Sequence, residues 1–191
     1  MSGLSFIKQY VTKPRTVGAV WPSSKYLAAK MVADIDFETA DTIVEYGPGT
    51  GVFTDKILKA RNPETKVLLL EFNPEFCALL DEKYKGQPNL YIVNDSAAEV
   101  GKYLGQYDIK LADYIISGLP FASLPLEVSS RILSETKKCL ISGGKFITFQ
   151  YTLLRKGFIE EYFSEIGIKR ELRNIPPAYV FSCGNEPEVI Q

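Results

Sequence analysis

Short runs of apolar residues alternate along this chain with longer segments in which apolar residues recur every three or four positions. The short runs predict strands at 42–46, 66–72, 90–94, 113–118 and 145–151. The intervening segments predict helices at 52–61, 74–85, 96–104 and 126–140. Strands and helices that alternate in this way are typical of a doubly wound parallel sheet with helices on both faces.

Residues that start and stop helices sharpen these boundaries. Asn73 followed by Pro74 is a typical N-cap and first-turn pair, and the Ser and Pro within 123–125 predict another helix start. The glycine pair at 143–144 is expected to end the last helix. The tail, 166–183, predicts two further strands that pair as an antiparallel hairpin at the edge of the sheet.

Composition removes several kinds of chemistry. The 191 residues have the length of about one domain, and they are 46% hydrophobic and 24% charged with a formal net charge of −1. The absence of histidine excludes Ser-His-Asp hydrolysis and histidine-ligated metals. Cys77, Cys139 and Cys183 are widely spaced, so we expect neither a disulfide framework nor a metal site, and a cytoplasmic location fits. The uncharged stretch 114–126 is too short and too rich in proline to span a membrane.

Positive charge gathers at the N-terminus. The first 33 residues carry five basic and no acidic side chains, a charge of +5. Within them, 4–11 can form an amphipathic helix, which could pack on the domain or lie on an anionic lipid surface. We therefore expect a helical cap at 1–36, a candidate membrane-contact segment, followed by a catalytic domain at 37–191.

A glycine-rich turn follows the first predicted strand. Gly47, Gly49 and Gly51, in the sequence EYGPGTGVF, allow a sharp turn and a close approach of the backbone to a ligand at the start of a helix. The spacing differs from that of a dinucleotide motif, and Glu45 would repel a pyrophosphate but attract a cation. The turn therefore predicts a site for a cationic, nucleoside-like ligand.

Acidic residues end the next two strands. Glu71, followed by Phe72, lies 20 residues beyond Gly51, where a carboxylate can bind both hydroxyls of a ribose. Asp95 and Ser96 follow the third strand, where a polar pair could contact the edge of an adenine. Together with the glycine turn, these residues predict a nucleoside site at the carboxyl ends of the strands.

The motifs EYGPGTG, LLEFNPE and NDSA resemble the nucleoside-binding motifs of class I S-adenosylmethionine-dependent methyltransferases. The resemblance covers about residues 40–183 and implies a Rossmann-like α/β fold, a seven-stranded, mostly parallel sheet with an antiparallel edge hairpin. It also implies S-adenosylmethionine as methyl donor and no metal. The cofactor-binding residues are then Glu45, Gly47, Gly49, Gly51, Glu71, Phe72, Asp95 and Ser96.

The loop after the fourth strand is the candidate acceptor site. Its residues are Ser117, Gly118, Leu119, Pro120 and Phe121. The loop resembles the second half of the Asn/Asp-Pro-Pro-Tyr/Phe motif of adenine amino-methyltransferases, but it begins with Ser in place of Asn or Asp. The resemblance implies that the carbonyls at 118–119 contact the amine.

Aromatic side chains near this loop could face a methylated ammonium through cation-π contacts. Phe121 is the first candidate because of its position in the motif, and Trp21, Tyr46 and Tyr179 are the others. With no histidine in the chain, a Tyr, an Asp or water would have to relay the amine's proton.

Three segments taken together resemble small bacterial phospholipid N-methyltransferases: 6–31 with its VGAVWPSS core, 44–54, and 117–125. This resemblance implies methylation of phosphatidylethanolamine by an enzyme peripheral to the inner face of the cell membrane. The same family also resembles ribosomal RNA adenine dimethylases, which leaves RNA adenine N6-dimethylation as an alternative. A sequence pI of about 5.7 and a chain that ends with the catalytic sheet favour lipid over nucleic acid. A noncatalytic nucleoside-binding or membrane-attachment module is the third alternative, and no pattern indicates an oligomeric state.

Overall fold

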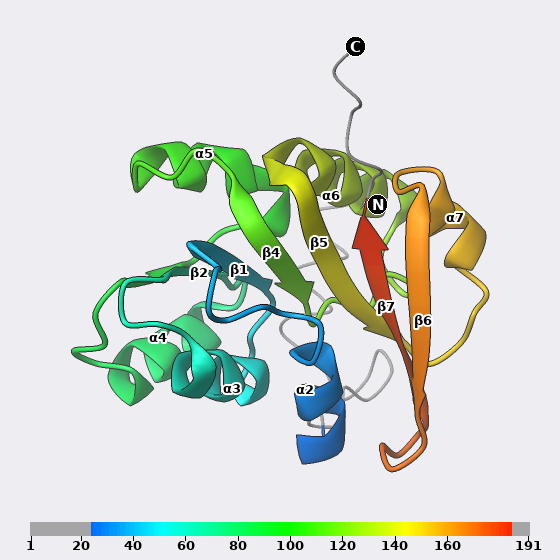
Figure 1. The fold of residues 1–191 in the computed structure, drawn as a ribbon, viewed down its shortest axis with the longest axis horizontal. Helices are drawn as coiled ribbons and strands as arrows, with labels where there is room; N and C mark the ends of the chain where they lie inside the picture. Colours follow the sequence, from blue (N-terminus) through cyan, green and yellow to red (C-terminus); the bar gives the residue numbers. More distant parts are fainter. Residues whose placement is uncertain (1–23, 185–191) are drawn as a thin grey trace.

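A seven-stranded sheet with helices on both faces forms the protein (Figure 1). The computed structural model describes residues 24–184. Its strands are β1 (Thr42–Tyr46), β2 (Lys66–Leu70), β3 (Leu90–Val93), β4 (Ala112–Ser117), β5 (Leu140–Gln150), β6 (Glu165–Glu171) and β7 (Ala178–Gly184). Its helices are α2 (Lys25–Met31), α3 (Val52–Ala60), α4 (Pro74–Lys83), the 3-10 helix η1 (Ala97–Glu99), α5 (Val100–Gln106), α6 (Leu126–Cys139) and α7 (Lys156–Glu160).

The strand order is β3-β2-β1-β4-β5-β7-β6. Strands β1 to β5 pair in parallel, whereas β7 runs antiparallel to both β5 and β6. The sheet therefore confirms the predicted doubly wound fold with an antiparallel edge hairpin. The strand order changes direction between β1 and β4, and their carboxyl ends form the crevice in which such sheets bind ligands.

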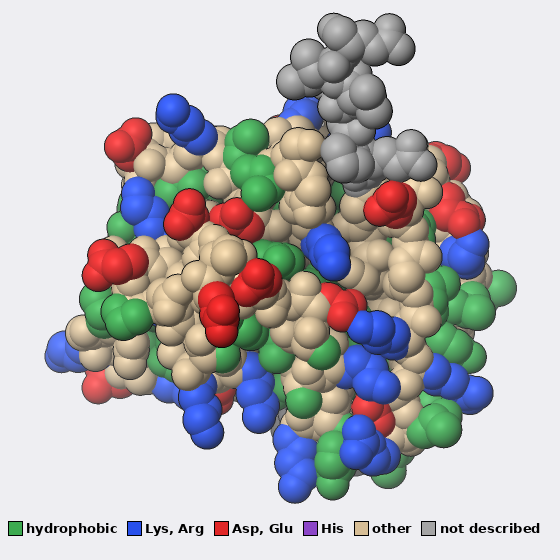
Figure 2. Space-filling view, viewed as in Figure 1, with side chains coloured by type: hydrophobic (Ala, Val, Ile, Leu, Met, Phe, Trp, Pro, Cys, Tyr) green, Lys and Arg blue, Asp and Glu red, His purple; other side chains and the backbone are tan. Residues whose placement is uncertain are grey.

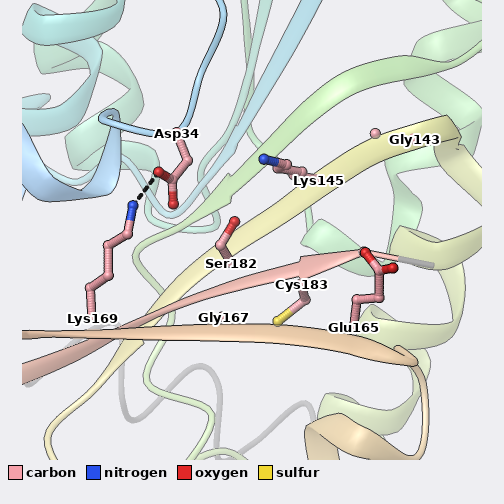
Figure 3. Close-up of a pocket in the computed structure, with 10 residues that line it drawn as sticks. Asp34, Gly143, Lys145, Glu165, Gly167, Lys169, Ser182 and Cys183 are labelled. Atoms are coloured by element: carbon pink, nitrogen blue, oxygen red, sulfur yellow. Dashed lines mark hydrogen bonds and ion pairs between the residues drawn. The ribbon is translucent and has the colours of Figure 1, made fainter. Parts of the chain in front are cut away.

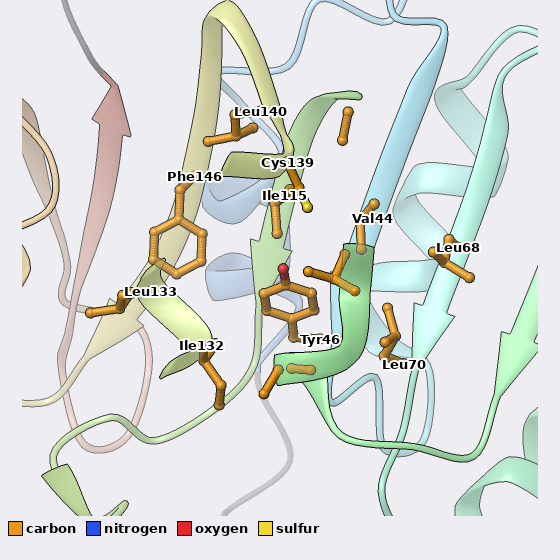
Figure 4. Close-up of a cluster of buried hydrophobic side chains, with 14 of the residues drawn as sticks. Val44, Tyr46, Leu68, Leu70, Ile115, Ile132, Leu133, Cys139, Leu140 and Phe146 are labelled. Atoms are coloured by element: carbon orange, nitrogen blue, oxygen red, sulfur yellow. The ribbon is translucent and has the colours of Figure 1, made fainter. Parts of the chain in front are cut away.

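Two apolar clusters hold the helices against the sheet. On one face, α5, α6 and α7 cover a cluster whose centre is drawn in Figure 4: Val44, Tyr46, Leu68, Leu70, Ile115, Ile132, Leu133, Cys139, Leu140 and Phe146. Helices α2 and α3 cover the other face. Full burial of each large apolar side chain stabilises the fold by about 1.5–3 kcal/mol, so these clusters supply the main driving force for folding.

Helix α2 belongs to the core of the domain. Its N-cap is Ser24, whose hydroxyl accepts a hydrogen bond from the Leu27 N–H. Leu27, Ala28 and Met31 are fully buried, in the same cluster as Phe53 of α3. This part of the proposed cap therefore packs on the sheet. The amphipathic helix predicted at 4–11 lies outside the described residues.

Most predicted boundaries agree with the structure, and two do not. Asn73 is the N-cap of α4, as expected, and its side chain accepts the Glu75 N–H. The glycine pair at 143–144 does not end a helix, because α6 stops at Cys139 and the pair lies inside β5. There it forms a bulge in which five residues of β5 advance against two of β4. Helix α6 also begins without a side-chain cap, with Pro125 in the N-cap position.

Three cysteines of the described chain, Cys77, Cys139 and Cys183, are buried free thiols. Within residues 24–184, no helix combines the length and apolarity needed to cross a bilayer.

Phe146 is the most informative core position to test. Its fully buried ring meets Phe121 edge-on at 5.9 Å and stacks on Phe163 at 5.5 Å. We expect Phe146→Ala to lower the free energy of unfolding by about 3–5 kcal/mol, because a cavity replaces these contacts. Urea denaturation measures the change. The neighbouring, exposed Lys145→Ala is the control, and equal losses for both variants would contradict this packing.

Candidate functional site

The glycine turn and the acceptor loop touch each other at the carboxyl ends of β1 and β4. Tyr46 and Ser117 are paired across these strands, and the Gly118 N–H donates a 2.8 Å hydrogen bond to the Tyr46 carbonyl. A Cβ on Gly118 would lie 2.8 Å from the carbonyl oxygen of Gly47, and one on Gly47 would lie 2.8 Å from the Leu119 side chain. The structure thus brings the two predicted segments together, with no room for a side chain between their backbones.

The turn itself needs glycine at 49 and 51. Gly49 has a φ of +56° and no heavy atom within 4 Å of its missing Cβ, so it borders open space where a ligand can approach. Gly51 has a φ of +83°, and a Cβ there would collide with the Tyr84 hydroxyl at 2.2 Å. That hydroxyl lies 2.9 Å from the Gly51 carbonyl and 2.7 Å from the Asp55 carboxylate, which fixes the turn against α3 and α4.

Glu71 lies across the open end of the turn. One of its carboxylate oxygens accepts the Gly49 N–H and the other accepts the Asn73 N–H, both at 2.9 Å. Its burial raises the pKa of the carboxyl, an effect that these backbone hydrogen bonds oppose. The Asn94 side chain donates to the carbonyls of Glu71 and Phe72, which fixes the backbone of both predicted site residues.

Glu45 is completely buried at the end of β1. The Thr54 hydroxyl donates a 2.7 Å hydrogen bond to one carboxyl oxygen, and the other oxygen, Oε1, has no partner among the described residues. Burial raises the pKa of Glu45 to about 8, and the nearby Glu71 and Asp55 add to the rise. The carboxyl therefore carries a proton at neutral pH and keeps an unused oxygen beside the glycine turn.

Asp95 and Ser96 lie after β3, as predicted. Asp95 accepts hydrogen bonds from the Ser96 N–H and from the Tyr103 hydroxyl, both at 2.7 Å. Partial burial raises the pKa of Asp95, but the hydrogen bonds from Tyr103, Ser96 and Lys102 outweigh it and leave the pKa below its usual value. Ser96 is the N-cap of η1 and accepts the Ala98 N–H. Asp95 is thus an ionised, oriented acceptor.

The acceptor loop is shaped mainly by its backbone. Ser117 is fully buried, and its hydroxyl accepts the Leu119 N–H at 3.1 Å. The ring of Phe121 is also fully buried, edge-on to Phe146, so it supports the loop from within the core and does not face open space. Pro120 begins the turn that leads to α6, and its carbonyl accepts the Ser123 N–H.

The other aromatic side chains considered for a cation-π contact with the acceptor are, where the structure describes them, buried to different degrees. Tyr46 is fully buried, with its hydroxyl 3.2 Å from that of Thr136, and therefore belongs to the core. Tyr179 is half-buried, and the guanidinium of Arg170 lies 5.5 Å from its ring centre. Trp21 lies outside the described residues.

The candidate residues named from the sequence did not include several that hydrogen-bond to the site: Thr54, Tyr84, Asn94 and Tyr103. Gln150 ends β5 and is 3% exposed, and its side-chain nitrogen has no partner among the described residues. Thr54 could have been noticed, because it lies within one helical turn of the glycines. The contacts of Tyr84 and Tyr103 depend on how separate helices pack.

These residues fit S-adenosylmethionine. The open space at Gly49 and the carboxylates of Glu71 and Asp95 suit a cationic ligand with a ribose. Glu45 is neutral, so it does not attract a cation by charge as the sequence predicted, but its unused oxygen can accept a hydrogen bond. Between residues 24 and 184, no three His, Cys, Asp or Glu side chains are grouped so that they could hold a metal ion.

A separate cavity of about 440 Å³ opens near the amino end of β5 (Figure 3). Lys145 projects into it, and Lys169 forms an ion pair with Asp34 at its edge. Its lining includes neither the glycine turn nor the acceptor loop, so we place the nucleoside site at the crevice between β1 and β4 and not in this cavity.

Comparisons with known proteins agree with this site. The family model for Ribosomal RNA adenine dimethylase matches residues 16–172. An ornithine lipid N-methyltransferase from Singulisphaera acidiphila is 31% identical over 180 residues, which cover 93% of each chain. Ribosomal RNA small subunit methyltransferase A from Dehalococcoides mccartyi is 28% identical over 132 residues, 66% of this chain but only 40% of that protein.

Solved structures show the same fold. The N-methyltransferase NodS from Bradyrhizobium japonicum WM9, in complex with S-adenosyl-L-homocysteine, superimposes with a TM-score of 0.65 at 10% identity and covers 95% of this chain and 97% of its own. Sheet order, glycine turn and relatives define a class I S-adenosylmethionine-dependent methyltransferase. Within that class, the chain belongs to the ribosomal RNA adenine dimethylase family.

Gly118 tests the contact between the two loops. In Gly118→Ala the new Cβ meets the Gly47 carbonyl oxygen, so we expect a loss of about 1–3 kcal/mol in the free energy of unfolding and at least about tenfold weaker binding of S-adenosylhomocysteine. Calorimetry measures both. Gly105→Ala, at an exposed helical position with open space, is the matched control and should stabilise by up to about 1 kcal/mol. Unchanged binding in Gly118→Ala would contradict the contact.

Glu45 predicts a particular pH dependence of stability. Its folded pKa of about 8 exceeds its ordinary value of 4.5, so the stability it contributes is complete below pH 4.5 and is lost as the pH rises toward 8. Relative to Glu45→Gln, the wild type should lose up to about 1.4 kcal/mol per pH unit across this window. Chemical denaturation at several pH values measures the difference. Glu64→Gln, on an exposed loop, should retain the wild-type slope.

Proposed function

We propose that this protein methylates the amine of a membrane lipid, with S-adenosylmethionine as the methyl donor. The observation that carries the proposal is the match to an ornithine lipid N-methyltransferase at 31% identity over 93% of both chains. The ribosomal RNA methyltransferase from Dehalococcoides mccartyi matches over only 40% of its own length. The lipid enzyme thus matches this chain over nearly its full length, whereas the ribosomal RNA enzyme does not, and this difference favours lipid.

The acceptor is then a primary amine on a lipid headgroup. The sequence motifs suggest phosphatidylethanolamine, whereas the relative acts, by its name, on ornithine lipid. The headgroup of each lipid carries an alkyl amine with a pKa of about 10, so its nitrogen must lose a proton before it can attack a methyl group. Because the chain has no histidine, the loss must involve a carboxylate, a tyrosine or water.

The residues of the chain position the two reactants. S-adenosylmethionine supplies a methyl group attached to a positively charged sulfur. Glu71 and Asp95 are assigned to its ribose and adenine, and the unused oxygen of the neutral Glu45 carboxyl is assigned as a hydrogen-bond acceptor beside the glycine turn. The carbonyls at 118–119 are assigned to the amine hydrogens. Because those carbonyls lie on a loop in contact with the glycine turn, alignment of amine and methyl group accounts for much of the catalysis.

Ser117 supports an alkyl amine as acceptor. Its hydroxyl already accepts the Leu119 N–H and is fully buried, so it is less available to bind an acceptor than the side chain of the Asn or Asp in the adenine motif. The Ser side chain is also shorter than Asn or Asp. A bound amine would be held chiefly by main-chain carbonyls, which do not require the planar edge of a base.

Dimethylation of adenine in ribosomal RNA is the second candidate. It is supported by the family model that matches residues 16–172 and by the 28% identical ribosomal RNA methyltransferase. A noncatalytic nucleoside-binding module is the third, and it requires binding without turnover.

Radiolabelled S-adenosylmethionine separates these candidates. The purified protein is incubated with ornithine lipid, with phosphatidylethanolamine, each in mixed micelles, and with undermethylated small-subunit ribosomal RNA. We expect label in the lipid fraction, resolved by thin-layer chromatography, and none above background in RNA. Label in RNA alone would refute the proposal.

Glu71→Ala is the matched inactive variant. Loss of a carboxylate that accepts two backbone N–H groups should weaken S-adenosylmethionine binding by about ten- to a hundredfold. Glu75→Ala, on the first turn of α4, should bind as the wild type does. Wild-type binding with no transfer to any of the three acceptors would favour the noncatalytic module.

A further inference from the structure

Two loops at the edge of the sheet expose large aliphatic side chains. The loop between β5 and α7 carries Leu154, which is 88% exposed, and the loop between β6 and β7 carries Ile175 and Leu172, which are 80% and 63% exposed. No other large apolar residue in the described chain is as exposed as these three. Single exposed leucines are ordinary, but the three highest exposures in two adjacent loops require an explanation.

Basic residues surround these side chains. Three segments, 24–31, 151–156 and 169–177, contain seven basic residues: Lys25, Lys30, Arg155, Lys156, Lys169, Arg170 and Arg173. Their one acidic residue, Glu171, is 2% exposed and is held by Arg173 and Lys30, which with the Arg173 backbone keep its pKa at about 2. Ion pairs to neighbouring Glu160 and Asp34 use two of the lysines. The surface still keeps an excess of positive charge.

Direct contacts join segments 24–31 and 169–177, and segment 151–156 begins directly after Gln150, which pairs with Tyr179 of β7. The Ser24 N–H donates to the Asn174 side chain at 3.1 Å, and the Lys30 ammonium donates to the Arg170 carbonyl at 2.7 Å. The Arg173 guanidinium lies 4.3 Å from the centre of the Tyr26 ring. Figure 2 shows basic and hydrophobic side chains gathered at the lower right of the view, over α2 and the β6–β7 hairpin. We call this surface, formed by the three segments, the basic-apolar rim.

The rim lies at the same end of the sheet as the acceptor loop, where the parallel strands have their carboxyl ends. Ser117, at the end of β4, pairs with Thr148, and β5 ends only two residues later, at Gln150. Loop 151–155 then begins the rim. In Figure 1, the carboxyl ends of β4 and β5, helix α2 and the β6–β7 loop all point toward the bottom of the view. A planar surface in contact with the rim would therefore face the acceptor site.

We infer that the basic-apolar rim docks the enzyme on an anionic phospholipid bilayer. Leu154, Ile175 and Leu172 enter the headgroup boundary while the surrounding Lys and Arg side chains contact lipid phosphates. The inference rests on the proposed lipid function and adds where the enzyme binds the membrane. An RNA surface would call for aromatic rings on which bases stack, whereas the three most exposed apolar side chains here are aliphatic and the ring of Tyr26, 38% exposed, already contacts Arg173.

Vesicle sedimentation tests the inference with the full chain. Leu154→Ser/Ile175→Ser should bind vesicles of phosphatidylcholine with phosphatidylglycerol at least about tenfold more weakly than the wild type, because two aliphatic anchors are lost. Leu79→Ser/Leu111→Ser replaces two exposed leucines remote from the rim and should bind as the wild type does. Equal binding by the wild type and the rim variant would overturn the inference.

A fluorescent label reports insertion directly, even if other parts of the chain also bind vesicles. The native cysteines at 77, 139 and 183 are buried, so an environment-sensitive dye will react selectively with Ile175→Cys. We expect its emission to shift to the blue with anionic vesicles, to shift less at high salt, and to stay unchanged for the dye on Leu111→Cys. No shift at position 175, or a shift produced by ribosomal RNA and not by vesicles, would overturn the inference.

Transfer in mixed micelles separates docking from the proposed function. Leu154→Ser/Ile175→Ser should retain methyl transfer to lipid dispersed in detergent while losing vesicle binding, which supports both proposals. If the wild type transfers no methyl group to lipid yet the dye at 175 still inserts, the proposed function fails and the docking surface stands.

Discussion

The site depends on the close approach of two backbones at the carboxyl ends of β1 and β4. Gly118 donates to the Tyr46 carbonyl and lies so near Gly47 that neither glycine has space for a side chain. This contact fixes the cofactor turn relative to the acceptor loop, two segments about 70 residues apart in the chain. Methyl transfer needs the reacting atoms aligned within a few tenths of an ångström, and a direct backbone contact is a stiffer way to achieve this than side chains would be.

The pattern of apolar residues was sufficient to predict the architecture. The strands of a parallel sheet are buried on both faces, so they are continuous apolar runs in the sequence, and β1 and β2 were located from such runs to within two residues. The glycine pair at 143–144 was wrongly predicted to end a helix, because glycine ends helices and also permits bulges. Only the register of β5 against β4, a tertiary property, distinguishes the two roles.

The sequence predicted where the candidate site residues lie in the fold better than it predicted their surroundings. Spacing from the glycine turn was enough to find Glu71 and Asp95 at the ends of their strands. Whether an aromatic ring faces a ligand or the core depends on helix packing, and Phe121 and Tyr46 lie in the core for that reason. The two exposed loops of the rim carry no motif at all. They lie together because segments far apart in the sequence meet in the fold, which no local pattern records.

The hydrogen bonds of Glu71 have a consequence for how the methyl donor binds and leaves. Its carboxylate orders the backbone at Gly49 and Asn73 through hydrogen bonds within the protein itself. Folding has therefore met the entropic cost of ordering the turn, and the donor can bind without a further ordering step. Spent donor can likewise leave without any local unfolding of the turn. Exchange of spent donor for fresh donor therefore requires no rearrangement of the glycine turn.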